Sequence, residues 1–183
     1  MILLVHPGAA VMLAMPDAAS VLMERQYRYA LRQHVYELPA GKIDPGEDAL
    51  ETAKLYLLDT LAVAWAGSDA PGCRETHALM ADEGGRADAT AWAYGGKLPV
   101  ASAAFINGMS SAALDYDSLS SDAPVHVNIA VLPAALALAE KRRASGIEFL
   151  TALVLASDVT CRLGAAAAHP PRGFHYTGVF GVF

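Results

Sequence analysis

The hydrophobic and polar positions of the chain follow two different periods, and the change falls near residue 52. Before it, apolar and polar residues alternate through HPGAAVMLAM and VLMERQYRY, with the turn PDAAS between them, which predicts two strands joined by a short loop. ELPAGKIDPGED is typical of a strand end followed by a Gly/Pro loop. After this loop the period is helical almost throughout. The pattern therefore predicts a short β-rich segment and then a mainly helical body.

The helical period is interrupted in a few places, which divides the second part into separate helices. The predicted helices cover about residues 50–66, 102–114, 132–143 and 146–163. Asp48 is the expected N-cap of the first helix, and Gly67 its stop. The basic run at 141–143 suits the negative end of the third helix dipole. Ser145 and Glu148 have the spacing of a capping box, which opens the fourth helix. Between the first two helices, AWAYGGKLP predicts a short extended segment and a turn.

The apolar stripes of these helices predict which side chains form the core. The expected core residues are leucines at helical spacing and one tryptophan: Leu57, Leu58, Leu61, Trp65, Leu132, Leu136, Leu150 and Leu153. Clusters of alanine between them are small enough to let helices approach closely.

Composition excludes several classes of protein. Of 183 residues 54% are hydrophobic and 17% charged, which excludes a disordered chain and leaves a surface short of charge. Thirteen basic against nineteen acidic residues give a net charge of −6, so no basic face for nucleic acid is expected. The apolar runs are short or interrupted by polar residues, and the N-terminus lacks the basic start of a signal peptide, so we expect a cytoplasmic protein without a membrane span. Cys73 and Cys161 are isolated and are expected to be reduced and structural.

The first part of the chain carries a recognisable but broken motif. RQYRY and ELPAGKIDPGE, within residues 6–54, resemble the start of the Nudix hydrolases of the ADP-ribose pyrophosphatase branch. The resemblance implies a box whose glutamates hold Mg²⁺ against a diphosphate, and Gly41 and Glu47 match its first two positions. The later positions of the box hold unsuitable residues: Leu55, Tyr56, Asp59, Thr60 and Ala62. A divalent ion needs several hard oxygen ligands, so metal-dependent diphosphate hydrolysis is disfavoured.

The second part resembles a different family. AKLYLLDTLAVAWAGSDAPG, AAFINGMSSAALDYD, HVNIAVLPAALALAE, SGIEFLTALVLASDVTCRLG and GFHYTGVFG occur in this order, and together they resemble the N-terminal helical region of the MmgE/PrpD family. That family includes 2-methylcitrate dehydratase, cis-aconitate decarboxylase and iminodisuccinate epimerase. We therefore assign residues 1–52 to a partial Nudix-like β segment and residues 53–183 to the N-terminal part of an MmgE/PrpD-like helical domain. Such a chain would be a junction of two beginnings, made by a gene fusion or by an error of assembly.

The MmgE/PrpD resemblance implies proton transfer next to a carboxylate of a small di- or tricarboxylic acid. The outcome would be dehydration, decarboxylation or epimerisation, and neither a metal nor an organic cofactor is implied. Chemistry of this kind needs an acid/base group that titrates near neutrality and donors for the substrate carboxylates.

Matching the family motifs residue by residue gives candidates for the site. The resemblance implies catalytic roles for Asp115 in ALDYD, His126 in PVHVN and His175 in GFHYTG. Candidate substrate contacts are Asp117, Arg172 and Thr177. Ser118 and Leu119 stand where many family members carry Asp and Thr, and the loop before His126 looks about one residue longer, so the particular acid stays open.

A structural role is open for each catalytic candidate. Asp115 could end a helix and start a turn, as could Asp117, and His126 could cap or pack at a helix entry. The Gly-rich surroundings of His175 favour a functional role over a structural one. His6, His34, His77 and His169 match no motif, and surface or packing roles are expected for them.

Two functions from different classes remain. The first is a portion of an MmgE/PrpD-type lyase or isomerase, with a small carboxylic acid as its substrate and with little or no turnover by itself, because Arg172 is the only basic residue near the candidates. The second is a noncatalytic helical fragment whose apolar faces bind a partner. In either case uncovered helix faces are expected to cause self-association, most simply into a dimer.

Overall fold

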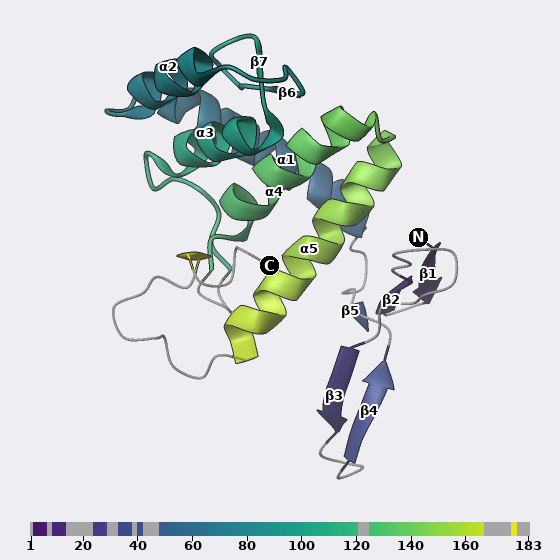
Figure 1. Cartoon of the computed structure of the whole chain (residues 1–183). Coiled ribbons are helices and arrows are strands. Elements are labelled where there is room, and N and C mark those ends of the chain that lie inside the picture. Colours follow the sequence, from purple (N-terminus) through teal and green to yellow (C-terminus); the bar gives the residue numbers. More distant parts are fainter. Residues whose placement is uncertain are drawn as a thin grey trace. The chain divides into compact units, whose positions relative to one another are not determined.

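The computed structural model divides the chain into two compact units, Met1–Ala49 and Leu50–Phe183. It describes residues 2–6, 9–13, 24–28, 33–37, 40–41, 48–120, 125–166 and 177–178, the five segments before residue 42 by their backbone. The smaller unit holds short strands and the larger one holds helices (Figure 1). The predicted fold class, mainly helical with a β-rich segment in front, is confirmed.

The strands of the smaller unit pair in two groups. They are β1 (Ile2–His6), β2 (Ala9–Leu13), β3 (Glu24–Arg28), β4 (Gln33–Glu37) and β5 (Ala40–Gly41). β2 pairs antiparallel with both β1 and β5, and β3 pairs antiparallel with β4. Both strands expected on either side of PDAAS are present, as β2 and β3. In the described pairing they are not partners of each other: two residues separate β1 from β2 and four separate β3 from β4, short connections of the kind that favour antiparallel hairpins.

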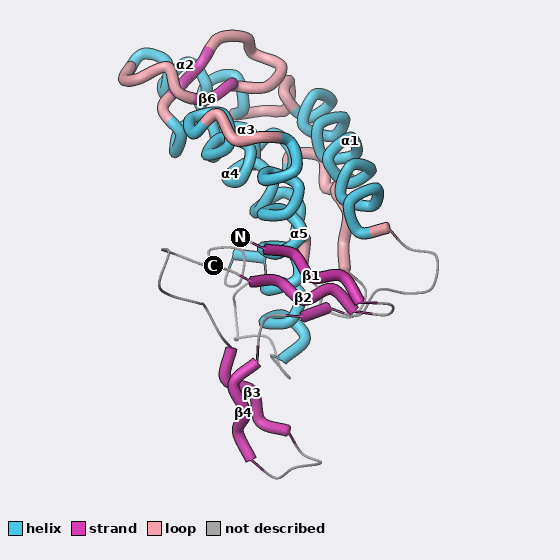
Figure 2. Tube along the Cα trace, turned by 90° about the vertical axis from the view of Figure 1, so that its right-hand side faces the viewer, coloured by secondary structure: helices cyan, strands magenta, loops and turns pink. Residues whose placement is uncertain are grey.

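Five helices and a small hairpin are described in the larger unit. They are α1 (Ala49–Gly67), α2 (Cys73–Glu83), β6 (Ala89–Thr90), β7 (Lys97–Leu98), α3 (Val100–Ala112), α4 (Val127–Arg142) and α5 (Gly146–Ala166). Figure 1 shows α4 between α3 and α5, and it makes its most extensive helix contacts with these two. In Figure 2 the β6 segment lies at the α2 end of this group of helices. Two clusters of buried apolar residues form the core, one centred on Leu132 and Leu153 and one on Ile106.

The helix ends follow the local sequence. At the start of α5, the Ser145 amide donates to Glu148 Oε2 over 2.8 Å and the Glu148 amide donates to Ser145 Oγ over 3.3 Å, which confirms the predicted capping box. The Ser145 hydroxyl also donates to Glu148 Oε2 over 2.7 Å, and the hydrogen bonds from the hydroxyl and the amide of Ser145 hold the pKa of Glu148 below its ordinary value. At the other end of the preceding helix, Arg143 takes a left-handed conformation (φ 54°) as the C-cap of α4.

Two helices differ from the prediction. α4 begins at Val127 rather than near residue 132, because the helix accommodates Pro133 in its interior. Proline has no N–H to donate to the carbonyl four residues earlier, which is that of Ile129. Gly108 of α3 packs closely at this position, since a Cβ there would lie 3.0 Å from the Ile129 oxygen. The second difference is α2, which was not predicted; only Cys73 of this helix is buried.

The core prediction holds for α4 and α5 and fails for part of α1. Leu132 and Leu153 are buried, and Leu57, Leu136 and Leu150 pack against the same cluster. Leu58 and Trp65, in contrast, are 66% and 69% exposed, so their assignment to the core was wrong.

The face of α1 that is buried holds small residues: Ala53, Thr60, Ala64 and Gly67. Large apolar side chains of α1, including Leu55, Leu58 and Trp65, are exposed, whereas the buried face carries the small residues that allow another helix to approach closely. A Cβ on Gly67 would lie 2.1 Å from the Ser110 carbonyl oxygen of α3.

The β6–β7 hairpin is fastened to α3 and α4 by two buried or half-buried polar side chains. Asn107 of α3 accepts from the Trp92 amide over 2.8 Å and donates to the Thr90 carbonyl over 2.9 Å. Glu140 of α4 accepts from the Thr90 amide and hydroxyl and from Lys97. The extended segment and turn predicted from AWAYGGKLP are therefore present and held by side chains far away in the sequence.

By length and mean hydropathy alone, α5 is the one helix among the described residues that would suffice to cross a membrane. Part of its apolar surface packs against α4, with Phe149 and Leu153 buried in the core. Its polar residues include Asp158 and Arg162, which form an ion pair at 2.7 Å. The two cysteines are unpaired, Cys73 buried and Cys161 half-buried.

Candidate functional site

The candidate site lies where the chain leaves α3 and enters α4. Helix α3 ends at Ala112, and the Asp115 amide donates to the Ala112 carbonyl over 3.1 Å, which closes a turn. Asp115 has a positive φ of 55°, a left-handed conformation that aspartate adopts more readily than most residues. The turn directs the chain through Asp117 and back to His126, the N-cap of α4.

Three hydrogen bonds fasten this loop to the start of α4. Asp117 Oδ2 lies 2.7 Å from His126 Nδ1, and Asn128 Nδ2 donates to Ser118 Oγ over 2.8 Å. The Ser120 amide donates to the Val125 carbonyl over 3.2 Å. The Asp-x-Asp segment therefore lies against the histidine that follows it nine residues later.

These contacts bring together three of the side chains chosen from the sequence. One ligand atom from each of Asp115, Asp117 and His126 lies within 4.8 Å of the others. Asp115 is exposed, whereas the side chains of Asp117 and His126 are 4% and 17% exposed. Two carboxylates from the loop that follows α3 and the imidazole at the start of α4 therefore lie close together, although they are up to eleven residues apart in the sequence.

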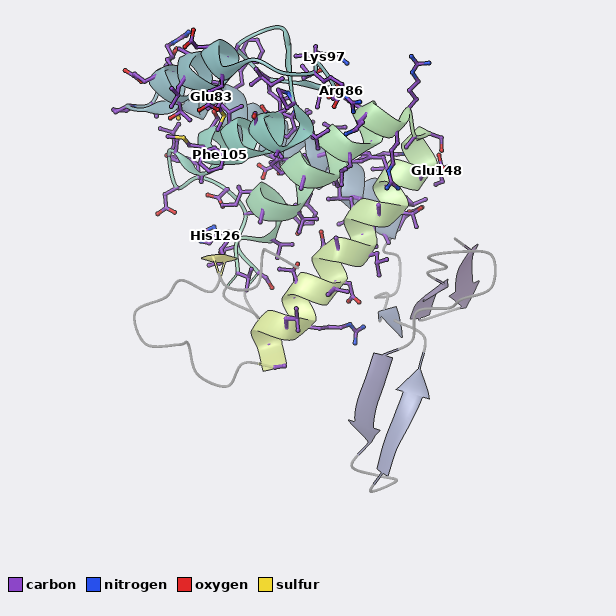
Figure 3. The ribbon with its side chains drawn as sticks, viewed as in Figure 1. Glu83, Arg86, Lys97, Phe105, His126 and Glu148 are labelled. Atoms are coloured by element: carbon purple, nitrogen blue, oxygen red, sulfur yellow. The ribbon has the colours of Figure 1, made fainter. Side chains whose placement is uncertain are left out.

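Thr177 belongs to the same place. The His126 amide donates to its Oγ1 over 2.8 Å, across 51 positions of sequence. Figure 3 shows His126 beside the short helical segment that holds Thr177 and Gly178. His175 and Arg172 lie outside the described residues, so the expected convergence of His175 with Asp115 stays a prediction.

Sequence reasoning did not assign the side chains that hold the loop. Ser118 was noted only as a departure from the family pattern, yet its hydroxyl accepts the hydrogen bond from Asn128, which is 8% exposed. An asparagine in the otherwise apolar run 125–139 was the available signal, because a buried amide requires partners. On the other side of the loop, Cys161 of α5 shares a hydrogen bond with Ser120, and burial raises the pKa of its thiol.

The same group of side chains has the composition of a possible cation site. Two carboxylates and a histidine can serve as metal ligands, and Asp115, Asp117 and His126 would be the ligands here. Asp117 and His126 already satisfy each other in a hydrogen bond, and the exposed Asp115 adds a single further carboxylate. The absence of a metal cofactor stays a prediction.

The comparisons with known proteins establish the family. The family model described as the MmgE/PrpD N-terminal domain matches residues 30–183, so the chain belongs to the MmgE/PrpD family. The match begins upstream of the boundary expected near residue 52.

Among curated proteins, the chain is 33% identical to the cis-aconitate decarboxylase-like protein oryM of Aspergillus oryzae over 144 residues, which are 73% of this chain and 30% of that protein. It is also 33% identical to the cis-aconitate decarboxylase of Aspergillus terreus over 148 residues, 76% of this chain and 30% of that protein. The chain therefore spans about a third of the length of these relatives.

A further relative corresponds to the other resemblance. The chain is 32% identical to the ADP-ribose pyrophosphatase of Bacillus subtilis over 87 residues, 43% of this chain and 47% of that protein. Of the box positions that carry the Nudix chemistry, Thr60 is buried on α1 and Leu55 is exposed. Neither residue is a metal ligand of the kind that the box requires.

Proposed function

We propose that this chain carries an acid/base part of an MmgE/PrpD-type lyase or isomerase that acts on small di- or tricarboxylic acids. The observation that supports this most is the meeting of Asp115, Asp117 and His126 at the start of α4, in a chain that is one third identical to a cis-aconitate decarboxylase. A histidine held by a carboxylate suits proton removal from, or delivery to, a carbon next to a carboxylate. Dehydration, decarboxylation and epimerisation all share that step.

We propose further that the chain has little or no turnover by itself. The described part of the site presents two carboxylates and one imidazole, whereas the substrates are polyanions that need cationic or amide donors. The positive end of the α4 dipole lies at this site and supplies only a part of that charge. The loss of a single preorganised donor commonly costs about 10²- to 10³-fold in rate.

The test is incubation of the purified chain with cis-aconitate and with 2-methylcitrate, with product measured by proton NMR. We expect conversion at the level of a protein-free control, because the described part of the site offers two carboxylates and one imidazole and no cationic side chain for the substrate carboxylates. Weak binding is expected nonetheless, with dissociation constants on the order of 1 mM and selective shifts of the His126 ring signals. Conversion that His126→Gln abolishes would contradict the proposed inactivity, and no shift with either acid would contradict the proposed substrate class.

Two controls separate this proposal from the others. ADP-ribose with Mg²⁺ should not be hydrolysed, because α1 lacks the glutamates of the Nudix box. Glu75→Gln, on the exposed surface of α2, should leave acid binding unchanged.

A noncatalytic helical interaction fragment is the second candidate, and one observation favours it. Leu55, Leu58 and Trp65 of α1 are each about two-thirds exposed and lie at i, i+3 and i+10, on one side of the helix. An exposed apolar stripe of this kind is typical of an association surface. The acid titration distinguishes the candidates, because a fragment of this kind associates without binding either acid.

A further inference from the structure

Asp117 is the most enclosed charged group of the candidate site. Its side chain is 4% exposed, against 17% for His126, and its Oδ2 is engaged with His126 Nδ1 at 2.7 Å. Carboxylates are rarely buried to this extent without a partner that compensates them. A side chain that binds substrate directly needs open space around its polar atoms. Of Asp115, Asp117 and His126, Asp117 is the least exposed.

The contact with Asp117 bears on where the proton of the imidazole resides, since Asp117 Oδ2 lies 2.7 Å from Nδ1. An ionised carboxylate can only accept hydrogen bonds, so beside an ionised Asp117 it is Nδ1 that carries the hydrogen. The lone pair of the neutral ring then lies on Nε2. Asp117 therefore selects one tautomer and one ring orientation.

A second restraint acts on the backbone of the same residue. The His126 amide donates to Thr177 Oγ1 over 2.8 Å, while His126 serves as the N-cap of α4. The ring is thus held from the loop after α3, and the backbone is held from a segment 51 residues later. Both hydrogen bonds restrain His126, and both partners, Asp117 and Thr177, lie outside α4.

We propose that Asp117 and Thr177 are positioning residues that act through His126: Asp117 fixes its Nδ1–H tautomer and ring orientation, and Thr177 fixes its backbone. Nε2 is then the atom that exchanges a proton with the substrate, and only this role of Nε2 rests on the proposed function. The proposal differs from the earlier expectation that both residues contact the substrate directly.

The first experiment measures the tautomer of His126 in the full 183-residue chain. The chain is labelled with ¹⁵N-histidine, treated with EDTA and studied by long-range ¹H–¹⁵N spectra at a pH where the imidazole is neutral, and His126→Gln assigns the signals. We expect the Nδ1–H form to predominate, whereas an unrestrained imidazole favours Nε2–H. Asp117→Ala should return the ring to mainly Nε2–H, and Asp158→Ala, which removes an equal charge from α5, should leave the ratio unchanged.

The spectrum of the parent chain tests the role of Asp117 even if a variant does not fold. Predominant Nε2–H in the parent overturns the role of Asp117, as does a tautomer ratio that Asp117→Ala leaves unchanged in a folded chain. Should Asp117→Ala fail to fold, Asp117→Asn preserves the volume of the side chain and should lower the Nδ1–H fraction. An unchanged fraction in that variant overturns the proposal as well.

The second experiment measures hydrogen exchange of the His126 amide. Thr177→Val removes the acceptor and keeps the shape, so the amide should exchange about 3- to 10-fold faster, the equivalent of one ordinary hydrogen bond. Thr177→Ser restores the hydroxyl and should restore the protection. Equal exchange in the two variants overturns the role of Thr177. Neither experiment depends on turnover, so a failure of the proposed lyase chemistry and a failure of the positioning roles are seen separately.

Discussion

At the scale of single residues, Glu140 shows how a half-buried carboxylate stabilises a fold. Burial acts to raise the pKa of Glu140, but hydrogen bonds from Thr90 and Lys97 outweigh it and hold the pKa below its ordinary value of 4.5. A carboxyl group with a lowered pKa in the folded state contributes stability above its unfolded pKa, and this contribution is lost as the pH falls through the folded pKa.

Glu140→Gln is therefore expected to lower the free energy of unfolding by about 1–3 kcal/mol at pH 7. The difference from the parent should begin to shrink as the pH falls below about 4.5, and it should disappear below the lower pKa of the folded carboxyl, where the parent is neutral too. Urea unfolding at pH 7 and at lower pH measures this. Glu75→Gln on exposed α2 is the matched control, and a Glu140 effect that is equal at all pH values would contradict the linkage.

A pair of leucines tests the assignment of the core. Leu132 is completely buried in α4, so Leu132→Ala should cost about 2–5 kcal/mol of unfolding free energy. Leu58 is 66% exposed on α1, so Leu58→Ala should change it by less than about 0.5 kcal/mol, contrary to the expectation from the helical stripe alone. Chemical denaturation of both variants decides the point, and equal losses would show that α1 packs on a different face.

At the scale of elements, the contact of α1 with α3 depends on one glycine. A Cβ on Gly67 would lie 2.1 Å from the Ser110 carbonyl oxygen, and backbone cannot move away as a flexible side chain would. Gly67→Ala should therefore cost about 1–3 kcal/mol through overpacking. Gly146→Ala is the matched control: it opens α5, has no heavy atom within 4 Å of the added Cβ, and should be neutral or slightly stabilising. Differential scanning calorimetry compares the two, and equal melting temperatures would contradict the close approach.

The residues of the candidate site in the loop between α3 and α4 were predicted from the local sequence, but the contacts that hold the loop were not. Asp115, Asp117 and His126 were chosen from motifs in the sequence, and the structure brings them together. The bonds that close the loop, from Ser118 to Asn128 and from Ser120 to Val125, were not predicted. Hydroxyls and amides have many possible partners, and only the path of the chain between two packed helices selects one.

At the scale of the whole molecule, the exposed stripe of α1 predicts self-association. Leu58→Glu together with Trp65→Glu places charges on the stripe, so the variant should sediment as a smaller species than the parent at equal concentration. Leu79→Glu, at a 61% exposed position of α2, is the control and should behave as the parent does. A monomeric parent would show that the stripe does not act as an association surface.

The amino-acid sequence by itself determined the change from alternating to helical periodicity, four of the five described helices, the capping box at Ser145 and the family motifs around Asp115 and His126. These features depend on neighbours within a few residues, so local spacing is enough to show them. Only the tertiary structure decided which face of α1 is buried, that Pro133 lies within α4, and that Thr177 meets the backbone of His126. Such choices depend on how closely two backbones approach and on which distant group satisfies a buried polar atom, and both are set by the packing of helices that are far apart in the sequence.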